Sequence, residues 1–342
     1  MRDLSVLVTA AGSPGTAALV RALRENGERR VRVIGTDMAE LAVGRHLCDA
    51  FHVVPAGDDP GFADAVAAVV DHEEVDAVLP QSSYDLPGLA AAREGFPCAV
   101  LVASPDAVRR SNDKAETYAL LDAIGALGPA WRRARGRAAV DAAARELGYP
   151  GEEIAVKPLE SSGSRGFRIL SASADPLQQL LTNRPGVAPA MQLEELLALL
   201  PAEGGPELLV MELARGKERT IDGVARGGRI VLGHPKTREA MRAGLAMYFE
   251  TLDDAALMDV AASIVRELEL DHFFNIQLVG DTVIEINPRI STVVYQEDLN
   301  LPYLGVKLAL GEIDETELAA ESTKIRPTRR ALRYFDQVEW DE

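Results

Sequence analysis

The first hundred residues alternate short apolar runs with amphipathic stretches. Apolar runs with the length of β-strands lie at residues 5–9, 31–35, 50–54, 76–80 and 98–102. Residues 16–26 and 60–72 have the spacing of amphipathic helices. Because strands that alternate with helices build a parallel sheet, the pattern predicts a doubly wound α/β unit over residues 1–110.

The pattern changes after residue 110, which indicates a second unit. A helix opens at Asn112 or Asp113, and either residue is a suitable N-cap. A loop rich in Gly and Ser, residues 160–166, lies between two short strand signals. We therefore predict a middle unit over residues 111–208.

A Glu-Gly-Gly-Pro break at residues 203–206 precedes a third unit. We expect this unit, residues 209–342, to begin with the apolar strand at 208–213. It contains further strand signals, a helix over 254–268 and a closing helix near 301–310.

The segment DTVIEINPRIS, residues 281–291, carries the strongest chemical signal. Strand side chains alternate between two faces. One face would carry Glu285, Asn287, Arg289 and Ser291. The opposite face would carry Ile284, Ile286 and Ile290.

The apolar run before this segment defines the expected strand pairing. A loop of three residues pairs Gln277 with Glu285 and Leu278 with Ile284, so that polar meets polar and apolar meets apolar. A loop of two residues would set Gln277 against Ile284 and lose that match. We therefore predict the longer loop, with Gln277, Glu285 and Asn287 converging on one spot.

This polar face suits a divalent metal beside a phosphoryl group. Hard cations such as Mg²⁺ prefer oxygen ligands, which Gln277, Glu285 and Asn287 would supply. The planar fork of Arg289 matches phosphate. The alternative is an amphipathic hairpin whose polar face is solvated.

The Gly/Ser loop after Lys157 is a second signal. Backbone amides in such a loop can wrap phosphate oxygens, because glycine permits close approach. A lysine beside the loop adds a positive charge. The loop positions concerned are Ser162, Gly163, Ser164 and Gly166. The alternative is an ordinary hairpin tip.

The run from Leu209 to Glu218 is a third candidate. An apolar strand leads into Glu212 and a turn at Gly216, and Glu218 precedes another strand. Such a linker could hold a flat heterocycle against its backbone, with Glu218 reaching ribose hydroxyls. An ordinary hairpin is again the alternative.

Two other motifs are less specific. The turn at residues 12–15 with Asp37 has the layout of a dinucleotide site but lacks the full G-x-G-x-x-G. It supports an anion or small acid at a helix N-terminus rather than NAD. None of the five histidines has metal-ligand spacing. His234 lies beside Lys236 and Arg238, a trio that could border a phosphate or substrate carboxylate, or form an exposed basic stretch.

The composition of the chain argues against several classes of function and partner. The net charge of −17 argues against nucleic acid or an anionic membrane as the main partner. Two cysteines, Cys48 and Cys98, indicate a reducing cytosol rather than a disulfide framework. No apolar run approaches the length of about 20 residues that spans a membrane, and the first one is short for a secretion signal. We therefore expect a cytoplasmic protein.

In chain order, these motifs resemble the ATP-grasp superfamily, especially the ATP-binding half of the carbamoyl-phosphate synthase large subunit and its stand-alone relatives. The order is Lys114, Lys157 with its loop, Met211-Glu212-Leu213 with Glu218, Gln277, and Glu285-Ile-Asn-Pro-Arg289. The resemblance covers nearly the whole chain. It implies an α/β chain with an ATP-grasp fold and an N-terminal Rossmann-like pre-ATP-grasp domain.

The resemblance implies a role for each matched position. By the resemblance, Lys114, Lys157 and the Gly/Ser loop contact the nucleotide phosphates. Met211, Glu212 and Leu213 bind adenine, and Glu218 binds ribose. Gln277, Glu285 and Asn287 bind Mg²⁺, or Mn²⁺ in its place. Arg289 binds the transferring phosphoryl group, with Lys236 and Arg238 beside it.

Three departures from the family pattern are visible. The chain is far shorter than a full synthase, which argues against carbamoyl phosphate as the product. Gln277 stands where many relatives have Glu. The segment 236–244 resembles stand-alone ligases more than the synthase.

The implied activity is that of an ATP-dependent carboxylate–amine ligase, which works through an acyl phosphate and releases ADP and phosphate. The alternatives are an ATP-grasp enzyme that phosphorylates or carboxylates a small acid, a nucleotide-binding protein without turnover, and a dehydrogenase. The partners would be a small carboxylic acid and an amine, and a homodimer is a common arrangement. Substrate candidates are Ser82, Ser83, Asp85, Arg238, Arg242 and Ser291.

Overall fold

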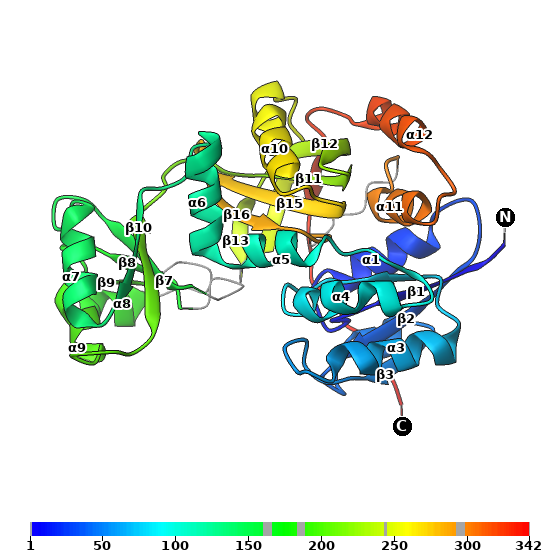
Figure 1. Ribbon diagram of the computed structural model, residues 1–342, viewed down its shortest axis with the longest axis horizontal. Coiled ribbons are helices and arrows are strands. Elements are labelled where there is room, and N and C mark those ends of the chain that lie inside the picture. Colours follow the sequence, from blue (N-terminus) through cyan, green and yellow to red (C-terminus); the bar gives the residue numbers. More distant parts are fainter. Residues whose placement is uncertain (1, 160–165, 183–188, 243–244, 292–297, 342) are drawn as a thin grey trace.

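The computed structural model describes residues 2–159, 166–182, 189–242, 245–291 and 298–341 (Figure 1). An N-terminal lobe (blue to cyan) and a C-terminal lobe (yellow to red) lie against each other, and a middle lobe (green) projects from one end. No helix within these ranges has the length and apolarity that crossing a bilayer requires.

The N-terminal lobe is built on a parallel sheet with the strand order β3-β2-β1-β4-β5. Its strands are β1 (Leu4–Val8), β2 (Val31–Asp37), β3 (Ala50–Val53), β4 (Ala77–Leu79) and β5 (Ala99–Val100). Its helices are α1 (Thr16–Arg24), α2 (Gly44–Leu47), α3 (Phe62–Glu73) and α4 (Leu86–Ala92). Val6 packs with Leu19 of α1 and Leu7 with Val66 of α3, so both faces of the sheet are covered. The predicted doubly wound unit is confirmed.

Two helices, α5 (Pro105–Asn112) and α6 (Lys114–Ile124), lead out of this lobe. The side chain of Asp113 accepts hydrogen bonds from the backbone N–H groups of Ala115 and Glu116 and so caps α6. The N-cap predicted at this point is confirmed as Asp113.

The middle lobe is a second sheet, with the order β6-β10-β7-β8-β9. Its strands are β6 (Trp131–Arg135), β7 (Ile154–Pro158), β8 (Arg168–Leu170), β9 (Ala190–Met191) and β10 (Glu207–Glu212). Its helices are α7 (Arg137–Glu146), α8 (Pro176–Thr182) and α9 (Leu193–Leu199). β10 lies between β6 and β7, so the expectation that this strand opens the C-terminal unit was wrong. The glycine-rich break before it connects α9 to β10 within the middle lobe and marks no lobe border.

The C-terminal lobe holds an antiparallel sheet in the order β12-β11-β15-β16 and a smaller one in the order β13-β14-β17. Their strands are β11 (Glu218–Arg226), β12 (Arg229–Thr237), β13 (Glu239–Arg242), β14 (Leu245–Glu250), β15 (His272–Val279), β16 (Thr282–Asn287) and β17 (Arg330–Leu332). The helices are α10 (Ala255–Glu267), α11 (Leu301–Ala309) and α12 (Glu315–Ala320).

The N- and C-terminal lobes share two apolar cores, whereas the middle lobe has a core of its own and reaches the first shared core through one face of its sheet, at Ala155, Leu209 and Met211. One shared core joins Val66 to Ile276, and the other joins Val6 to Phe273. The middle lobe encloses a separate core that includes Val140, Ile154 and Leu193. Because burial of apolar surface is the main stabilising term, we expect the middle lobe to move more readily than the other two move against each other.

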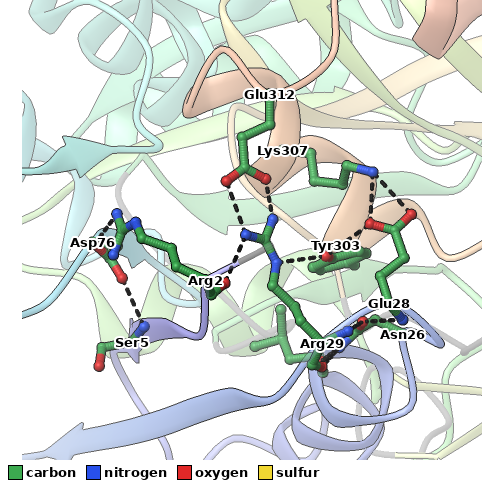
Figure 2. A network of polar contacts seen from close by, with 10 residues as sticks. Arg2, Ser5, Asn26, Glu28, Arg29, Asp76, Tyr303, Lys307 and Glu312 are labelled. Atoms are coloured by element: carbon green, nitrogen blue, oxygen red, sulfur yellow. Dashed lines mark hydrogen bonds and ion pairs between the residues drawn. The ribbon is translucent and has the colours of Figure 1, made fainter.

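A cluster of ion pairs reinforces the contact between the N-terminal lobe and α11 (Figure 2). The guanidinium of Arg29, only 2% exposed, binds the carboxylate of Glu312 and donates to the Tyr303 hydroxyl at 2.8 Å. Lys307 binds Glu28 at 2.8 Å. The bonds from Tyr303 and Arg29 therefore tie the loop after α1 to the C-terminal helices.

We expect Arg29→Met to lower the free energy of unfolding by about 2–3 kcal/mol, because it leaves the partly buried Glu312 without its cation. Chemical denaturation with urea measures this. The control is Arg30→Met at the exposed neighbouring position, which should change stability by less than about 0.5 kcal/mol. Equal losses in the two variants would show that the cluster does not stabilise the lobe contact.

Candidate functional site

The hairpin β15–β16 pairs Gln277 with Glu285 as the sequence predicts, but through a different loop. Val279 pairs with Thr282, so the turn has two residues rather than three. A register shift, a β-bulge, follows between Gln277 and Leu278. The bulge inserts one extra residue into β16 and restores the match of polar with polar.

The bulge also moves Ile284 out of the apolar face, which corrects the prediction for that residue. Leu278 faces Val283, and Val283 is the residue buried in the core. Ile284 is half-buried instead, and its carbonyl accepts a 2.9 Å hydrogen bond from the hydroxyl of Tyr118 on α6. The extra residue thus anchors β16 to the helix that begins at Lys114.

The sheet β12-β11-β15-β16 carries two rows of polar residues across its strands. The first row consists of Asn287, Asn275, Asp222 and His234. The second row consists of Glu285, Gln277, Thr220 and Lys236. Between the rows, Ile221, Ile276 and Ile286 point to the opposite face and into the apolar core. The fold therefore assembles one continuous polar face from four strands.

Glu285 and the two amides at the end of these rows fit a hard metal ion. Gln277 and Asn287 each donate a side-chain N–H to the carbonyl oxygen of Asn275, at 3.0 and 3.2 Å, so their own carbonyl oxygens point away from it. No described lysine or arginine lies within 4.0 Å of Glu285 in an ion pair. Three oxygen donors from neighbouring strands suit Mg²⁺. Among the described residues no cluster of three or more His, Cys, Asp or Glu is suited to a metal.

Arg289 lies at the junction of the C-terminal and N-terminal lobes. Its guanidinium donates to the Ser83 hydroxyl at 3.1 Å, to the Ile290 carbonyl at 2.9 Å and to Asn287 at 3.4 Å. Burial lowers the pKa of the guanidinium, and the negative charge of Glu285 opposes that shift. Arg289 is half-buried, and a cation in such a place without an ion-paired carboxylate among the described residues suits an anionic ligand.

Lys157 reaches the same region from the middle lobe. Its Nζ donates to the Tyr118 hydroxyl at 3.0 Å and is buried. Burial, and then the positive charge of Lys114, lower the pKa of Lys157 to about 7. Burial, and then the negative charge of Glu285, raise the pKa of Tyr118. The two predicted phosphate-binding lysines are therefore close enough to repel each other.

Most of the Gly/Ser loop, including Ser162, Gly163 and Ser164, lies outside the described residues. Gly166, which follows, has φ +74°, and a Cβ there would come within 2.8 Å of Pro158. Only glycine meets both conditions without strain. The chain thus turns sharply beside the strand that carries Lys157.

The predicted adenine and ribose positions lie where β10 passes into β11. The side chain of Met211 is buried, and the backbone N–H of Glu212 bonds the carbonyl of Ala130 at 2.9 Å. Arg238 donates to the Glu218 carboxylate at 2.8 Å. A ribose contact would therefore share Glu218 with Arg238. Leu213 is half-buried beside Met211.

The basic trio, with His234 and Lys236 on β12 and Arg238 directly after it, is not an exposed stretch. Lys236 is buried and forms a 2.6 Å ion pair with Asp222. Burial, and then the charge of Lys236, lower the pKa of His234 to about 4, so this imidazole is neutral at pH 7. Burial would raise the pKa of Asp222, but Lys236 and the Ser291 hydroxyl hold it below its usual value.

One substrate candidate from the N-terminal lobe, Ser83, borders a cavity of about 710 Å³. Its lining includes Asp58, Pro60, Ser83, Val108, Lys114 and Glu285. The cavity therefore runs from the outer loops of the N-terminal lobe to the polar face. Its volume lies in the range of ligand sites, about 300–1,000 Å³.

The other candidates are less open to a ligand. Ser82 accepts a hydrogen bond from the backbone of Tyr84. Asp85 is buried and accepts a hydrogen bond from the Thr9 hydroxyl. Ser291 donates to Asp222. Arg242 ends β13, and its side chain lies outside the described residues.

Sequence reasoning missed three residues that hold the site together. Tyr118 lies one helical turn after Lys114, so the two share a helix face. Asn275 precedes Gln277 by two residues and so shares its strand face, and Asp222 is its cross-strand partner. The alternation of strands could have signalled Asn275, but Asp222 required knowledge of which strands are neighbours.

Comparisons with known proteins agree with this architecture. Residues 205–331 match the family described as ATP-grasp in the biosynthetic pathway with Ter operon. Residues 6–101 match the PylC-like N-terminal domain. The carbamoyl phosphate synthase large chain of Halomonas eurihalina is 26% identical over 255 residues. That match covers 69% of this chain and 22% of the relative, so the chain spans about a fifth of the relative's length.

Solved structures share the fold over most of the chain. L-amino acid ligase from Bacillus licheniformis has a TM-score of 0.64 and 14% identity, with 96% of this chain and 78% of that one covered. The biotin carboxylase domain of Hydrogenobacter thermophilus 2-oxoglutarate carboxylase, solved with MgADP, has a TM-score of 0.64 and 14% identity. The matched region covers 90% of this chain and 69% of the chain in that structure.

Binding of a nucleoside diphosphate should make the chain take up a proton at pH 8. The Lys157 amine is mostly neutral there, and phosphate charge would raise its pKa. Titration calorimetry in buffers of different ionisation enthalpy should show uptake of about one proton at pH 8 and almost none at pH 6. Lys157→Met should remove the difference. The same uptake in that variant would assign the proton to another group.

Asp85→Asn should stabilise the chain above pH 6. Burial, and then the charge of Asp37, raise the pKa of Asp85 to about 6. The folded chain therefore binds the extra proton between about pH 4 and pH 6, and stability falls as pH rises through that window. The variant should gain up to about 3 kcal/mol at pH 7.5 relative to pH 4, by urea denaturation at both pH values. A gain that is equal at the two pH values would contradict this account.

Proposed function

We propose that this chain, a member of the ATP-grasp superfamily, is an ATP-dependent ligase that joins a small carboxylic acid to an amine. ADP and phosphate are the other products. The observation that carries the proposal is the convergence of Glu285, Gln277 and Asn287 with Arg289 beside a cavity of about 710 Å³.

In the first step, a carboxylate oxygen of the acid attacks the γ-phosphorus of ATP, and the bond to the bridging oxygen of ADP breaks. In the second step, the amine nitrogen attacks the acyl carbon, loses a proton, and displaces phosphate. Both steps depend mainly on positioning and on neutralising spread charge, so no nucleophilic side chain is needed.

The chain's own groups can supply that positioning. Lys114 and Lys157 would bind the phosphates of the nucleotide, and the Gly/Ser loop would cover them. Arg289 would stabilise the transferring phosphoryl group, because it is a half-buried cation without an ion-paired carboxylate among the described residues. Lys236 and Arg238 border the same face and would add positive charge.

The remaining contacts follow the same order along the chain. Residues 211–213 would hold adenine, and Glu218 ribose, in the junction of β10 and β11. Glu285, Gln277 and Asn287 would hold Mg²⁺, which neutralises phosphate charge when it is bound. The structure solved with MgADP supports this choice of ion by analogy of fold.

The middle lobe has most of its apolar packing in a core of its own and contacts the shared core through one sheet face, an arrangement that supports closure over the nucleotide. Lys157 belongs to this lobe, so its phosphate contact would link binding to closure. Closure would exclude water, which otherwise hydrolyses an acyl phosphate.

The cavity beside the polar face is the proposed place for the acid and the amine. Pro60 and Val108 give it apolar wall, and Ser83 connects it to Arg289. Asp58 lies at its outer end, where a cationic amine would be attracted. Ser82, Asp85 and Ser291 do not line this cavity and are less direct candidates, as is Arg242, whose side chain lies outside the described residues.

The test is release of ADP and phosphate from Mg-ATP with pools of amino acids and small carboxylic acids, followed by mass spectrometry. We expect a product lighter by one water than its two substrates. ADP release without a condensed product would instead favour an enzyme that phosphorylates or carboxylates the acid. ATP binding without turnover in any pool would favour a nucleotide-binding protein.

We expect Glu285→Ala to lower kcat on the order of 100-fold or more, because it removes the carboxylate from the metal face. The matched control is Asp281→Ala in the turn of the same hairpin, where the side chain is 86% exposed. That variant should keep its activity within about two-fold. Full activity of Glu285→Ala would refute the assignment of the metal site.

A further inference from the structure

The centre of the polar face is Asn275, a residue with no assigned role. It is 1% exposed and lies on β15 between β11 and β16. Its amide nitrogen donates to Asp222 at 2.9 Å and to the Thr220 hydroxyl. Its carbonyl oxygen accepts from Gln277 at 3.0 Å and from Asn287 at 3.2 Å. The buried amide of Asn275 therefore donates to two acceptors on one side and accepts from two donors on the other.

The orientation of Asn275 follows from the charge on Asp222. An ionised carboxylate can only accept hydrogen bonds. Asp222 accepts from Ser291 and forms the 2.6 Å ion pair with Lys236, which keeps it ionised. The side facing Asp222 must therefore be the NH₂ group of Asn275, and its carbonyl oxygen must face the other way.

The amides of Gln277 and Asn287 are oriented in turn. The Asn275 carbonyl oxygen is an acceptor, so each of these residues must present its NH₂ group to it. Their own carbonyl oxygens are then directed away from Asn275. Arg289 supports this for Asn287, since its guanidinium donates to the same Asn287 oxygen at 3.4 Å. Only one combination of orientations for the amides of Asn275, Gln277 and Asn287 satisfies all of these hydrogen bonds.

We propose that Asn275, held by Asp222, is the positioning residue that directs the carbonyl oxygens of Gln277 and Asn287 toward the metal, and that it determines the choice of glutamine at position 277. This inference rests on the proposed metal role of Glu285, Gln277 and Asn287. Asp222, Asn275, Gln277 and Asn287 together form what we call the amide network.

The amide network accounts for a neutral ligand where a carboxylate would attract a metal more strongly. A glutamate at 277 would place an acceptor 3.0 Å from the Asn275 oxygen, with no hydrogen between them. Asn275 could relieve that contact only by turning its own oxygen toward Asp222, which creates a second pair of facing acceptors. The ion pair of Asp222 with Lys236 therefore disfavours glutamate at position 277 on β15, the strand next to that of Asp222.

The experiment compares ADP affinity in EDTA with ADP affinity in excess Mn²⁺, both by titration calorimetry. The ratio of the two dissociation constants measures the metal contribution to binding. Asn275→Ala should reduce this ratio about ten-fold or more, as loss of a residue that orients metal ligands does. Its ADP affinity in EDTA should stay within about two-fold of the parent, which a general loss of structure would not allow.

Gln277→Glu gives a second, independent reading at a half-buried position. Despite the added charge, the ratio of the ADP dissociation constants in EDTA and in Mn²⁺ should be no larger for this variant than for the parent. In the Asn275→Ala background the same change should raise the ratio about ten-fold, because the opposing oxygen is gone. This reversal of effect is specific to orientation, and a purely structural role for Asn275 would not produce it.

Asn26→Ala is the matched control. Asn26 is another asparagine hub, which donates to the carbonyls of Leu23 and Arg29 and accepts from the N–H groups of Glu28 and Arg29 (Figure 2). It lies in the lobe contact and not on the polar face. Its replacement should lower Tm but leave the ratio unchanged.

The outcomes separate this inference from the proposed function. A parent ratio lost in Glu285→Ala but kept in Asn275→Ala overturns the role of Asn275 alone. A ten-fold gain from Gln277→Glu in the parent background overturns it as well. A parent ratio of one, or one unaffected by Glu285→Ala, removes the metal assignment and this inference with it. Product formation in the ligase assay is judged separately.

Discussion

The buried ion pair between Asp222 and Lys236 determines which way the hydrogen-bond donors and acceptors of the polar face are oriented. A charge in such a place is tolerated only when it is paired and its remaining acceptor capacity is used. Here Ser291 and Asn275 use that capacity, and Asn275 passes the constraint on to Gln277 and Asn287. Two of the three candidate metal ligands, Gln277 and Asn287, are therefore neutral amides whose orientation is decided at a carboxylate they do not touch.

The division of the apolar cores gives this face its setting. The N- and C-terminal lobes share two cores, and ion pairs around Arg29 and Lys307 add to the contact. Arg289 and its partner Ser83 meet across that contact, so their geometry depends on it. The middle lobe, with a core of its own, carries Lys157 into the site. The result is a polar face fixed between two lobes and a third lobe that brings Lys157 to it.

The sequence predicted the doubly wound lobe, an N-cap at Asn112 or Asp113 and the pairing of Gln277 with Glu285, because each depends on local spacing or alternation. It misjudged Ile284, since alternation cannot foresee a bulge that adds one residue to a strand. It also misjudged β10, since a glycine-rich turn looks the same within a sheet as between lobes. The roles given to Lys114, Glu218 and Met211 by resemblance stay predictions.

By itself the sequence determined which residue types could meet a nucleotide and a metal, because strand alternation places Glu285, Asn287 and Arg289 on one face and the motif order identifies their kind. Only the tertiary structure decided how they are oriented. The hydrogen bonds that fix Gln277 and Asn287 come through Asn275 from Asp222 on a neighbouring strand. Strand order is a property of the folded sheet, and no pattern within one strand records what lies beside it.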